Sequence, residues 1–175
     1  MEKYDEERIM QQREIKLGIP SYITVESEEG SFIGEQNSSK FEKEDICVEA
    51  NENGEIWLTA DTTPVKTVKL RWNTPLERTS KILGGAWERT YGDAEWKGMS
   101  GTRFMPWYFL ALNEGVVTGY GVKVRPSAMC FWQADTRGIT LVLDVRCGGT
   151  GVVLSGRKLL AAEIVAMRAD DCTSF

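Results

Sequence analysis

The sequence predicts an all-β protein, a two-sheet antiparallel β-sandwich, and three observations carry that prediction. Apolar and polar residues alternate in many short segments, which is the period of a strand with one buried face. Clusters of Gly, Asn, Asp and Pro separate these segments at near-regular spacing, as turns between short strands do. Strands do not alternate with long amphipathic helices, so a parallel sheet of βαβ units is not indicated.

The first 20 residues are expected to form a lead segment, and residues 21–175 the sandwich domain. Within the lead segment, residues 4–17 fit a short polar helix with a thin apolar stripe that includes Ile9 and Met10. Gly18 and Pro20 would end this helix. The polar stretch from residue 27 to residue 45 is predicted to be a loop region, with a turn at Gly30.

The clearest hairpin joins residues 46–50 to residues 55–60, because both segments alternate with the period of a strand. Asn53 and Gly54 stand between them, and both residue types tolerate the positive φ that a tight turn requires. The next strand begins shortly afterwards and places Val68, Leu70 and Trp72 on one face.

The second half of the chain continues the pattern. Residues 104–112 are apolar on both faces, as in a strand buried on both sides, although Pro106 argues against a central position. In residues 116–124, Tyr120 should face the core, whereas Gly119 and Gly121 leave a flat strip on the opposite face. Residues 139–147 have one clean apolar face, and residues 157–169 fit strands or one amphipathic helix, of which strand is favoured in this context.

Composition excludes several classes of function. The net charge of −5 and the scattered Lys and Arg residues argue against nucleic-acid binding, and the apolar runs are too short to cross a membrane. The four cysteines lie far apart without a CxxC pair, so no zinc site is indicated. They are expected to be reduced thiols of a cytoplasmic protein. The chain has no histidine, which removes Ser-His and Cys-His nucleophile pairs and the commonest general base.

Residues 83–110 form the densest aromatic and acidic stretch, and they raise three alternatives. Asp93 and Glu95 have a spacing that carboxylate catalysis permits, but any D-x-E on a strand has it, so solvent-facing charges or partners for Arg89 and Arg103 fit better. Aromatic rings interleaved with carboxylates also suit a sugar, whose C–H faces stack on rings while its hydroxyls bond polar groups. The third alternative is that the tryptophans of this stretch only pack in a core or between domains, as large aromatics usually do.

Three segments in order suggest a family: "WERTYGDAEW", "MPWYFLALNEGVVTGYGVKV" and "CFWQADTRGITLVLDVRCGGTGVVLSGRKL". They resemble the N-terminal β-domain of α-galactosidases of glycoside hydrolase family 36, over about residues 68–160. The resemblance implies a β-supersandwich that precedes a catalytic (β/α)₈ barrel in a retaining enzyme without metal or organic cofactor. In that family the nucleophile lies in a K-W-D type motif of the barrel, which this sequence lacks, so no catalytic residue is assigned here.

The resemblance implies a non-catalytic accessory domain that packs on the barrel and helps to wall the pocket for an α-galactoside-type carbohydrate. The chain is shorter than the usual N-terminal domain of that family, so a sheet edge or apolar face is expected to be exposed at its C-terminal end, and a homo-oligomer would be one way to cover it. The alternatives are a free-standing carbohydrate-binding module and a structural or oligomerisation module. The candidate substrate-binding residues are Trp87, Glu88, Arg89, Tyr91, Asp93, Glu95 and Trp96.

Overall fold

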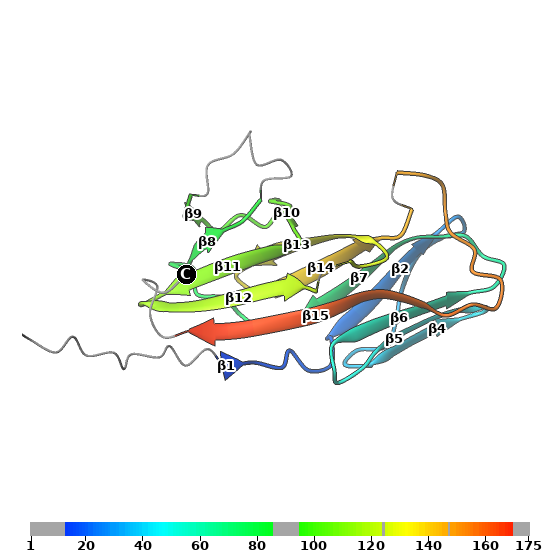
Figure 1. The fold of residues 1–175 in the computed structure, drawn as a ribbon, viewed down its shortest axis with the longest axis horizontal. Coiled ribbons are helices and arrows are strands. Elements are labelled where there is room, and N and C mark those ends of the chain that lie inside the picture. Colours follow the sequence, from blue (N-terminus) through cyan, green and yellow to red (C-terminus); the bar gives the residue numbers. More distant parts are fainter. Residues whose placement is uncertain (1–12, 86–94, 124, 147, 170–175) are drawn as a thin grey trace, which may run out of the picture.

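The computed structural model describes residues 13–85, 95–123, 125–146 and 148–169, and in these ranges it contains strands and turns but no helix. Two antiparallel sheets are layered, and in Figure 1 the strands of the smaller sheet lie behind β11, β12 and β15 of the larger one. The fold class predicted from the sequence is therefore confirmed. The strands are β1 (Arg13–Glu14), β2 (Tyr22–Ser27), β3 (Gly30–Ile33), β4 (Lys40–Lys43), β5 (Ile46–Ala50), β6 (Glu55–Ala60), β7 (Val65–Trp72), β8 (Lys81–Leu83), β9 (Lys97–Gly98), β10 (Met105–Pro106), β11 (Tyr108–Asn113), β12 (Val116–Val122), β13 (Met129–Asp135), β14 (Gly138–Asp144) and β15 (Leu159–Ala169).

The strand order shows how the sandwich is assembled. The nine-stranded sheet runs β4-β5-β6-β15-β12-β11-β8-β9, with β1 as an additional partner of β15. The six-stranded sheet runs β10-β13-β14-β7-β2-β3. Strand β15 is the longest, with 11 residues, and one side of it pairs first with β6 and later with β1. A register shift between Leu160 and Ala162 marks a bulge in the part that pairs with β6.

The core lies between the two inner faces. Alternation along the strands places every second side chain inside, so that Leu70 on β7 and Leu141 on β14 have no exposed surface. An aromatic cluster fills the centre: the ring of Trp132 lies 5.9 Å from that of Phe109 and 6.2 Å from those of Trp72 and Tyr120. Burial of one such large side chain stabilises the fold by roughly 1.5–3 kcal/mol.

Most strand predictions are confirmed. The predicted β5–β6 hairpin forms, with Ile46 opposite Ala60 and Ala50 opposite Ile56, and Gly54 has a φ of 82° in its turn. Residues 159–169 form strand β15 rather than a helix. Pro106 lies in β10, which is an edge strand, where a missing backbone N–H is tolerated.

The prediction that residues 104–112 form one strand buried on both sides is wrong, because β10 and β11 belong to different sheets and Phe104, Trp107 and Tyr108 are exposed. Two further predictions are wrong for a different reason. The sequence predicts a helix over residues 4–17, but the described part of this range is not helical. Arg13 and Glu14 form β1, and residues 15–17 have no regular secondary structure. Residues 4–12 lie outside the described residues. The polar stretch 27–45 is not only loop, because it contains β3 and β4, whose buried or half-buried Phe41 and Phe32 attach these short edge strands to the core. Pairing with an existing sheet overrides weak local patterns in both places.

A carboxylate ties two turns together at the end of the β6 strand. The Asp45 carboxylate accepts hydrogen bonds from the backbone N–H and the hydroxyl of both Thr62 and Thr63. The bonds from the Thr63 hydroxyl and from the two backbone N–H groups hold the pKa of Asp45 far below its usual range. The β4–β5 turn is thereby fixed to the loop that leads into β7.

Candidate functional site

The structure describes only the last part of the predicted sugar-binding stretch. Glu95 and Trp96 are described, and both are exposed, Trp96 by 38%. The other predicted residues stay untested because they lie outside the described residues: Trp87, Glu88, Arg89, Tyr91 and Asp93.

The charges around Glu95 pair differently from the expectation. Glu95 faces Lys97, with 3.7 Å between carboxylate and ammonium, and not Arg103. Arg103 instead donates to the backbone carbonyl of Ile82 over 3.4 Å and so attaches the segment before β10 to β8. The pairing of carboxylates with Arg89 lies outside the described residues.

Four aromatic side chains are exposed over a short stretch of sequence: Trp96 by 38%, Phe104 by 50%, Trp107 by 42% and Tyr108 by 56%. We call these four residues the aromatic ridge. They account for four of the seven large hydrophobic side chains that are exposed in the described part of the chain, so their concentration is not incidental. Of the packing alternative, the part that places Trp96 and Trp107 in the core of this domain is wrong, because both are exposed, while packing of these two residues between domains stays a prediction.

The position of the aromatic ridge is explained by the point at which the chain passes from one sheet to the other. Strand β10 belongs to the six-stranded sheet and β11 to the nine-stranded sheet, and Trp107 is the residue between them. Phe104 packs edge-on against Phe131 of β13, with ring centres 5.0 Å apart. Tyr108 starts β11 opposite Gly121. Phe104, Trp107 and Tyr108 therefore lie at the corner at which the chain changes sheet, and Trp96 directly precedes β9, which pairs with β8 of the nine-stranded sheet.

Trp107 is held in an unusual backbone conformation. Its φ is 67°, in the left-handed region that a bulky side chain rarely adopts. Three hydrogen bonds fix it: its N–H donates to Cys130 O (3.1 Å), and its carbonyl accepts from Val122 N (3.0 Å) and Trp132 Nε1 (3.3 Å). Such strained residues persist where the surrounding structure determines them, and they are frequent at binding sites. The fold thus fixes the backbone of a residue whose indole is exposed.

The glycine strip predicted on β12 lies beside β11 in the same sheet, next to side chains of β11. Gly119 is opposite Leu110, and a Cβ atom on Gly119 would lie 3.0 Å from the Leu110 Cδ2 atom. Tyr120 faces inward as predicted and stacks on Phe109, with ring centres 4.8 Å apart. Side chains of this same protein therefore cover the strip at Gly119, and it is not a free platform for a ligand.

Polar groups beside the ridge are used within the protein. Gln133 donates to the carbonyl of Gly101 over 3.2 Å, and Arg71 donates to Asp135 over 2.8 Å. Although partial burial disfavours the charged form of Asp135, its bonds from Arg71 and from two backbone N–H groups keep its pKa below the usual value. The ring faces, rather than these side chains, are left available for a ligand.

The carboxyl groups with clear shifts do not suit glycosidase acid catalysis. A general acid for glycoside cleavage needs a raised pKa. The pKa is lowered in Asp45, Glu49, Glu55 and Asp135, in each case through hydrogen bonds to the charged form. These four carboxylates are kept in the charged form by hydrogen bonds within the protein.

Comparison with protein-family models, curated proteins and solved structures finds no match to this chain. The relation to glycoside hydrolase family 36 therefore stays a prediction from the sequence. The described residues contain no group of three or more His, Cys, Asp or Glu side chains placed to hold a metal ion. They also contain no helix with the length and hydrophobicity that a membrane crossing needs.

Proposed function

We propose that this chain is a non-catalytic β-sandwich domain that binds carbohydrate through the aromatic ridge, as an accessory domain of an α-galactosidase-like glycoside hydrolase. The observation that carries the proposal is Trp107, whose indole is exposed and whose backbone is kept in a left-handed conformation by three hydrogen bonds, one of them from the Trp132 indole. A bulky side chain rarely adopts this conformation. The family resemblance of residues 68–160 supplies the sugar class, α-galactosides.

The chemistry of the ridge fits a pyranose better than a charged ligand. Rings of Trp and Tyr present flat apolar faces on which the C–H faces of a sugar stack. Trp107 and Tyr108 are neighbours in the sequence and both are exposed, so two aromatic side chains are available to a sugar at the β10–β11 corner.

Titration of the protein with galactose and raffinose tests the proposal. Saturable changes are expected in tryptophan fluorescence and in the indole signal of Trp107 in nitrogen-15 correlation spectra. Trp107→Ala and Tyr108→Ala should each weaken binding by about fivefold, since an aromatic contact contributes about 1 kcal/mol. No turnover of an aryl α-galactoside is expected.

Trp57→Ala is the matched control. Trp57 is half-buried, lies on β6 and has the Lys158 ammonium 5.3 Å above its ring, so its removal should leave sugar binding unchanged. The proposal fails if neither sugar shifts the Trp107 signal, or if Trp57→Ala weakens binding as much as Trp107→Ala does.

A second candidate function, a structural or oligomerisation module, is favoured by the outer face of the nine-stranded sheet. Neighbouring strands of this sheet place partly exposed apolar side chains on that face. The residues are Leu83, Leu110, Leu112, Val165 and Met167. Light scattering over a range of concentrations separates the two: association that Met167→Glu abolishes, without any sugar response, would favour assembly.

A further inference from the structure

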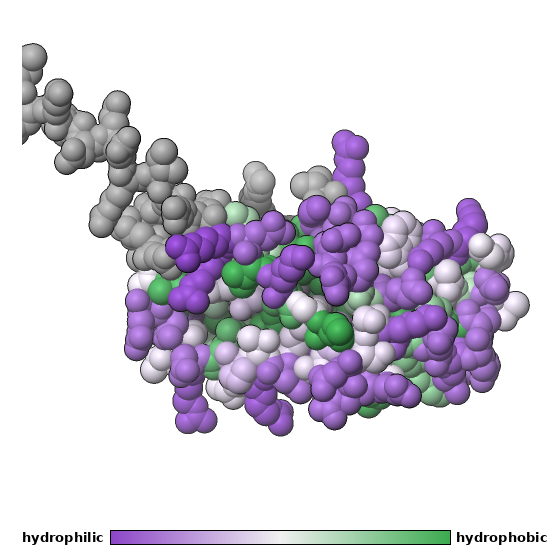
Figure 2. Space-filling model, turned by 90° about the horizontal axis from the view of Figure 1, so that it is seen from below, coloured by the Kyte–Doolittle hydropathy of each residue, from purple (hydrophilic) through white to green (hydrophobic). Residues whose placement is uncertain are grey.

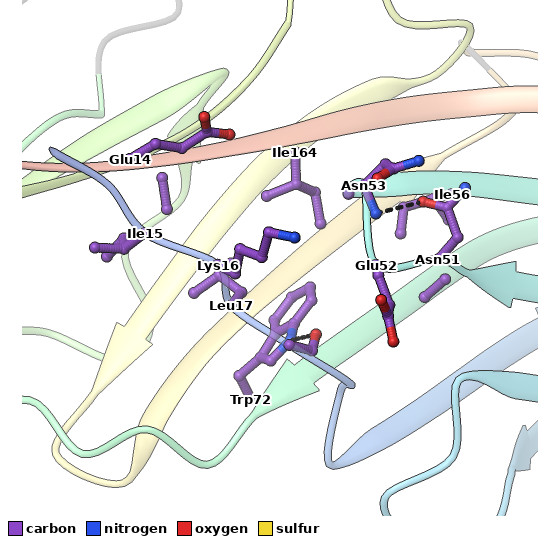
Figure 3. Close-up of a pocket in the computed structure, with 14 residues that line it drawn as sticks. Glu14, Ile15, Lys16, Leu17, Asn51, Glu52, Asn53, Ile56, Trp72 and Ile164 are labelled. Atoms are coloured by element: carbon purple, nitrogen blue, oxygen red, sulfur yellow. Dashed lines mark hydrogen bonds between the residues drawn. The ribbon is translucent and has the colours of Figure 1, made fainter.

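A pocket lies away from the β10–β11 corner, beside β1 and the β5–β6 turn, which are on the lower side of the ribbon in Figure 1. It has a volume of about 150 Å³ and lies between the N-terminal segment (residues 14–18) and the β5–β6 turn (residues 51–54). Figure 3 shows both walls with Trp72 between them. Seen from below, hydrophobic side chains reach the surface between charged ones in the middle of this face (Figure 2).

The pocket exists because β15 changes its partner there. The N–H of Ile164 donates to Gly54 O over 2.8 Å, at the end of the β6 pairing. The carbonyl of Ala166 accepts from Ile15 N over 2.9 Å, where the pairing with β1 begins. The β5–β6 turn and the N-terminal segment thus meet the same edge of β15 without meeting each other, and a gap stays open between them.

Both walls of the pocket are rigid. The side-chain oxygen of Asn51 accepts from the backbone N–H of Asn53 (3.0 Å) and of Glu55 (2.9 Å), which fixes the turn. The indole N–H of Trp72 donates to Gly18 O over 3.0 Å, which fixes the N-terminal segment against the core. The pocket is therefore preformed, so a ligand would not have to order these walls on binding.

Two opposite charges lie on opposite walls. Lys16 extends from the N-terminal segment toward the turn, and Glu52 stands on the turn (Figure 3). Neither takes part in an ion pair with another described residue. The rest of the lining is mixed, and its apolar part includes Leu17, Ile56 and Ile164.

We infer that this pocket binds a small zwitterion with an aliphatic substituent, of the chemical class of an apolar α-amino acid. The carboxylate of such a ligand would pair with Lys16 and its ammonium with Glu52, while the substituent covers Leu17, Ile56 and Ile164. A simple anion is disfavoured by Glu52 and by Glu14 at the same pocket, and a simple cation would leave Lys16 without a partner, whereas a zwitterion pairs with both signs of charge. This site is independent of the sugar proposed for the aromatic ridge.

Titration of nitrogen-15-labelled protein with L-leucine tests the inference. The indole N–H of Trp72 and the amide of Gly54 should shift in a saturable way, whereas the indole of Trp107 should not move. 4-Methylpentanoate, which lacks the ammonium, and 3-methylbutylamine, which lacks the carboxylate, should each bind about tenfold more weakly, because each loses one charge-assisted contact. A response to galactose at Trp72 instead would overturn the inference.

Variants of the two charges complete the test. Lys16→Met and Glu52→Gln keep most of the side-chain shape and should each weaken leucine binding by about five- to tenfold. Lys69→Met and Glu29→Gln are matched controls, since both positions are exposed and lie outside the pocket lining. Unchanged thermal unfolding of all four variants would show that they fold. Leucine binding that survives both pocket variants, or no binding at all, refutes the zwitterion site.

Discussion

The aromatic core cluster and the aromatic ridge contain the same residue types with opposite exposure. Phe109 has no exposed surface, while its neighbours in the sequence, Trp107 and Tyr108, are exposed by 42% and 56%. Alternation along β11 explains Tyr108, which points away from the core because Phe109 points into it. The change of sheet explains Trp107, because a residue between two strands of different sheets belongs to neither inner face.

The two groups are connected through one hydrogen bond. The indole of Trp132, fully buried in the core, donates to the carbonyl of Trp107 over 3.3 Å. The core therefore helps to set the backbone that exposes the ridge. The comparison teaches that buried aromatics here determine shape and stability, whereas exposed aromatics are available for binding.

Truncation of the buried aromatic should have the largest effect. Trp132→Ala would leave a cavity beside Phe109 and Tyr120 and remove the donor to Trp107, so a loss of about 3–5 kcal/mol in the free energy of unfolding is expected. Trp107→Ala should change the same quantity by no more than about 1 kcal/mol, because its indole is exposed. Urea unfolding of both variants measures the difference, and equal losses would refute the division into core and ridge.

A polar side chain near the surface can serve the fold rather than a ligand, and Asp45 is an example. Its carboxylate is fully engaged with Thr62 and Thr63, so Asp45→Asn should destabilise the fold measurably at neutral pH. Because the pKa of Asp45 is lowered in the folded state, this stabilisation is complete above the unfolded pKa, about 3.9, and is lost as the pH falls through the folded pKa.

The measurement is the thermal midpoint of wild type and Asp45→Asn from neutral pH to about pH 2, a range that starts above the unfolded pKa. The gap between the two should be largest at neutral pH and should narrow in acid. Glu29→Gln, an exposed position in the β2–β3 turn, should show no such gap. A gap that stays constant over the whole range would show that the charge of Asp45 is not what ties the two turns.

The sequence predicts the parts of the fold in which the hydrophobic pattern is strong. In residues 139–145 the alternating apolar residues are all buried, and Asn53-Gly54 correctly marks a hairpin turn. Strands β3 and β4 are missed because each has a single aromatic anchor, Phe32 or Phe41, among polar residues. Such strands form through pairing with neighbours, which a local pattern does not contain.

The candidate site is only partly accessible from the sequence. The aromatic stretch is visible there, but the exposure of Phe104, Trp107 and Tyr108 is not, since strand alternation alone does not reveal a change of sheet. Pro106 was the available signal, because a proline in an apolar strand indicates an edge or an interruption. The pocket at Lys16 has no local signal, because its walls lie about 35 residues apart in the sequence and meet only at β15.

The smallest expected effect tests the strain at Trp107 itself. Glycine adopts the left-handed region without a steric penalty, whereas alanine does not. Trp107→Gly should therefore be more stable than Trp107→Ala by about 0.5–1 kcal/mol, although glycine usually costs stability relative to alanine. Urea unfolding of the two variants measures this difference. The reverse order would mean that the backbone at residue 107 relaxes once the indole is gone, and that the indole, rather than the three hydrogen bonds, holds the corner in its left-handed conformation.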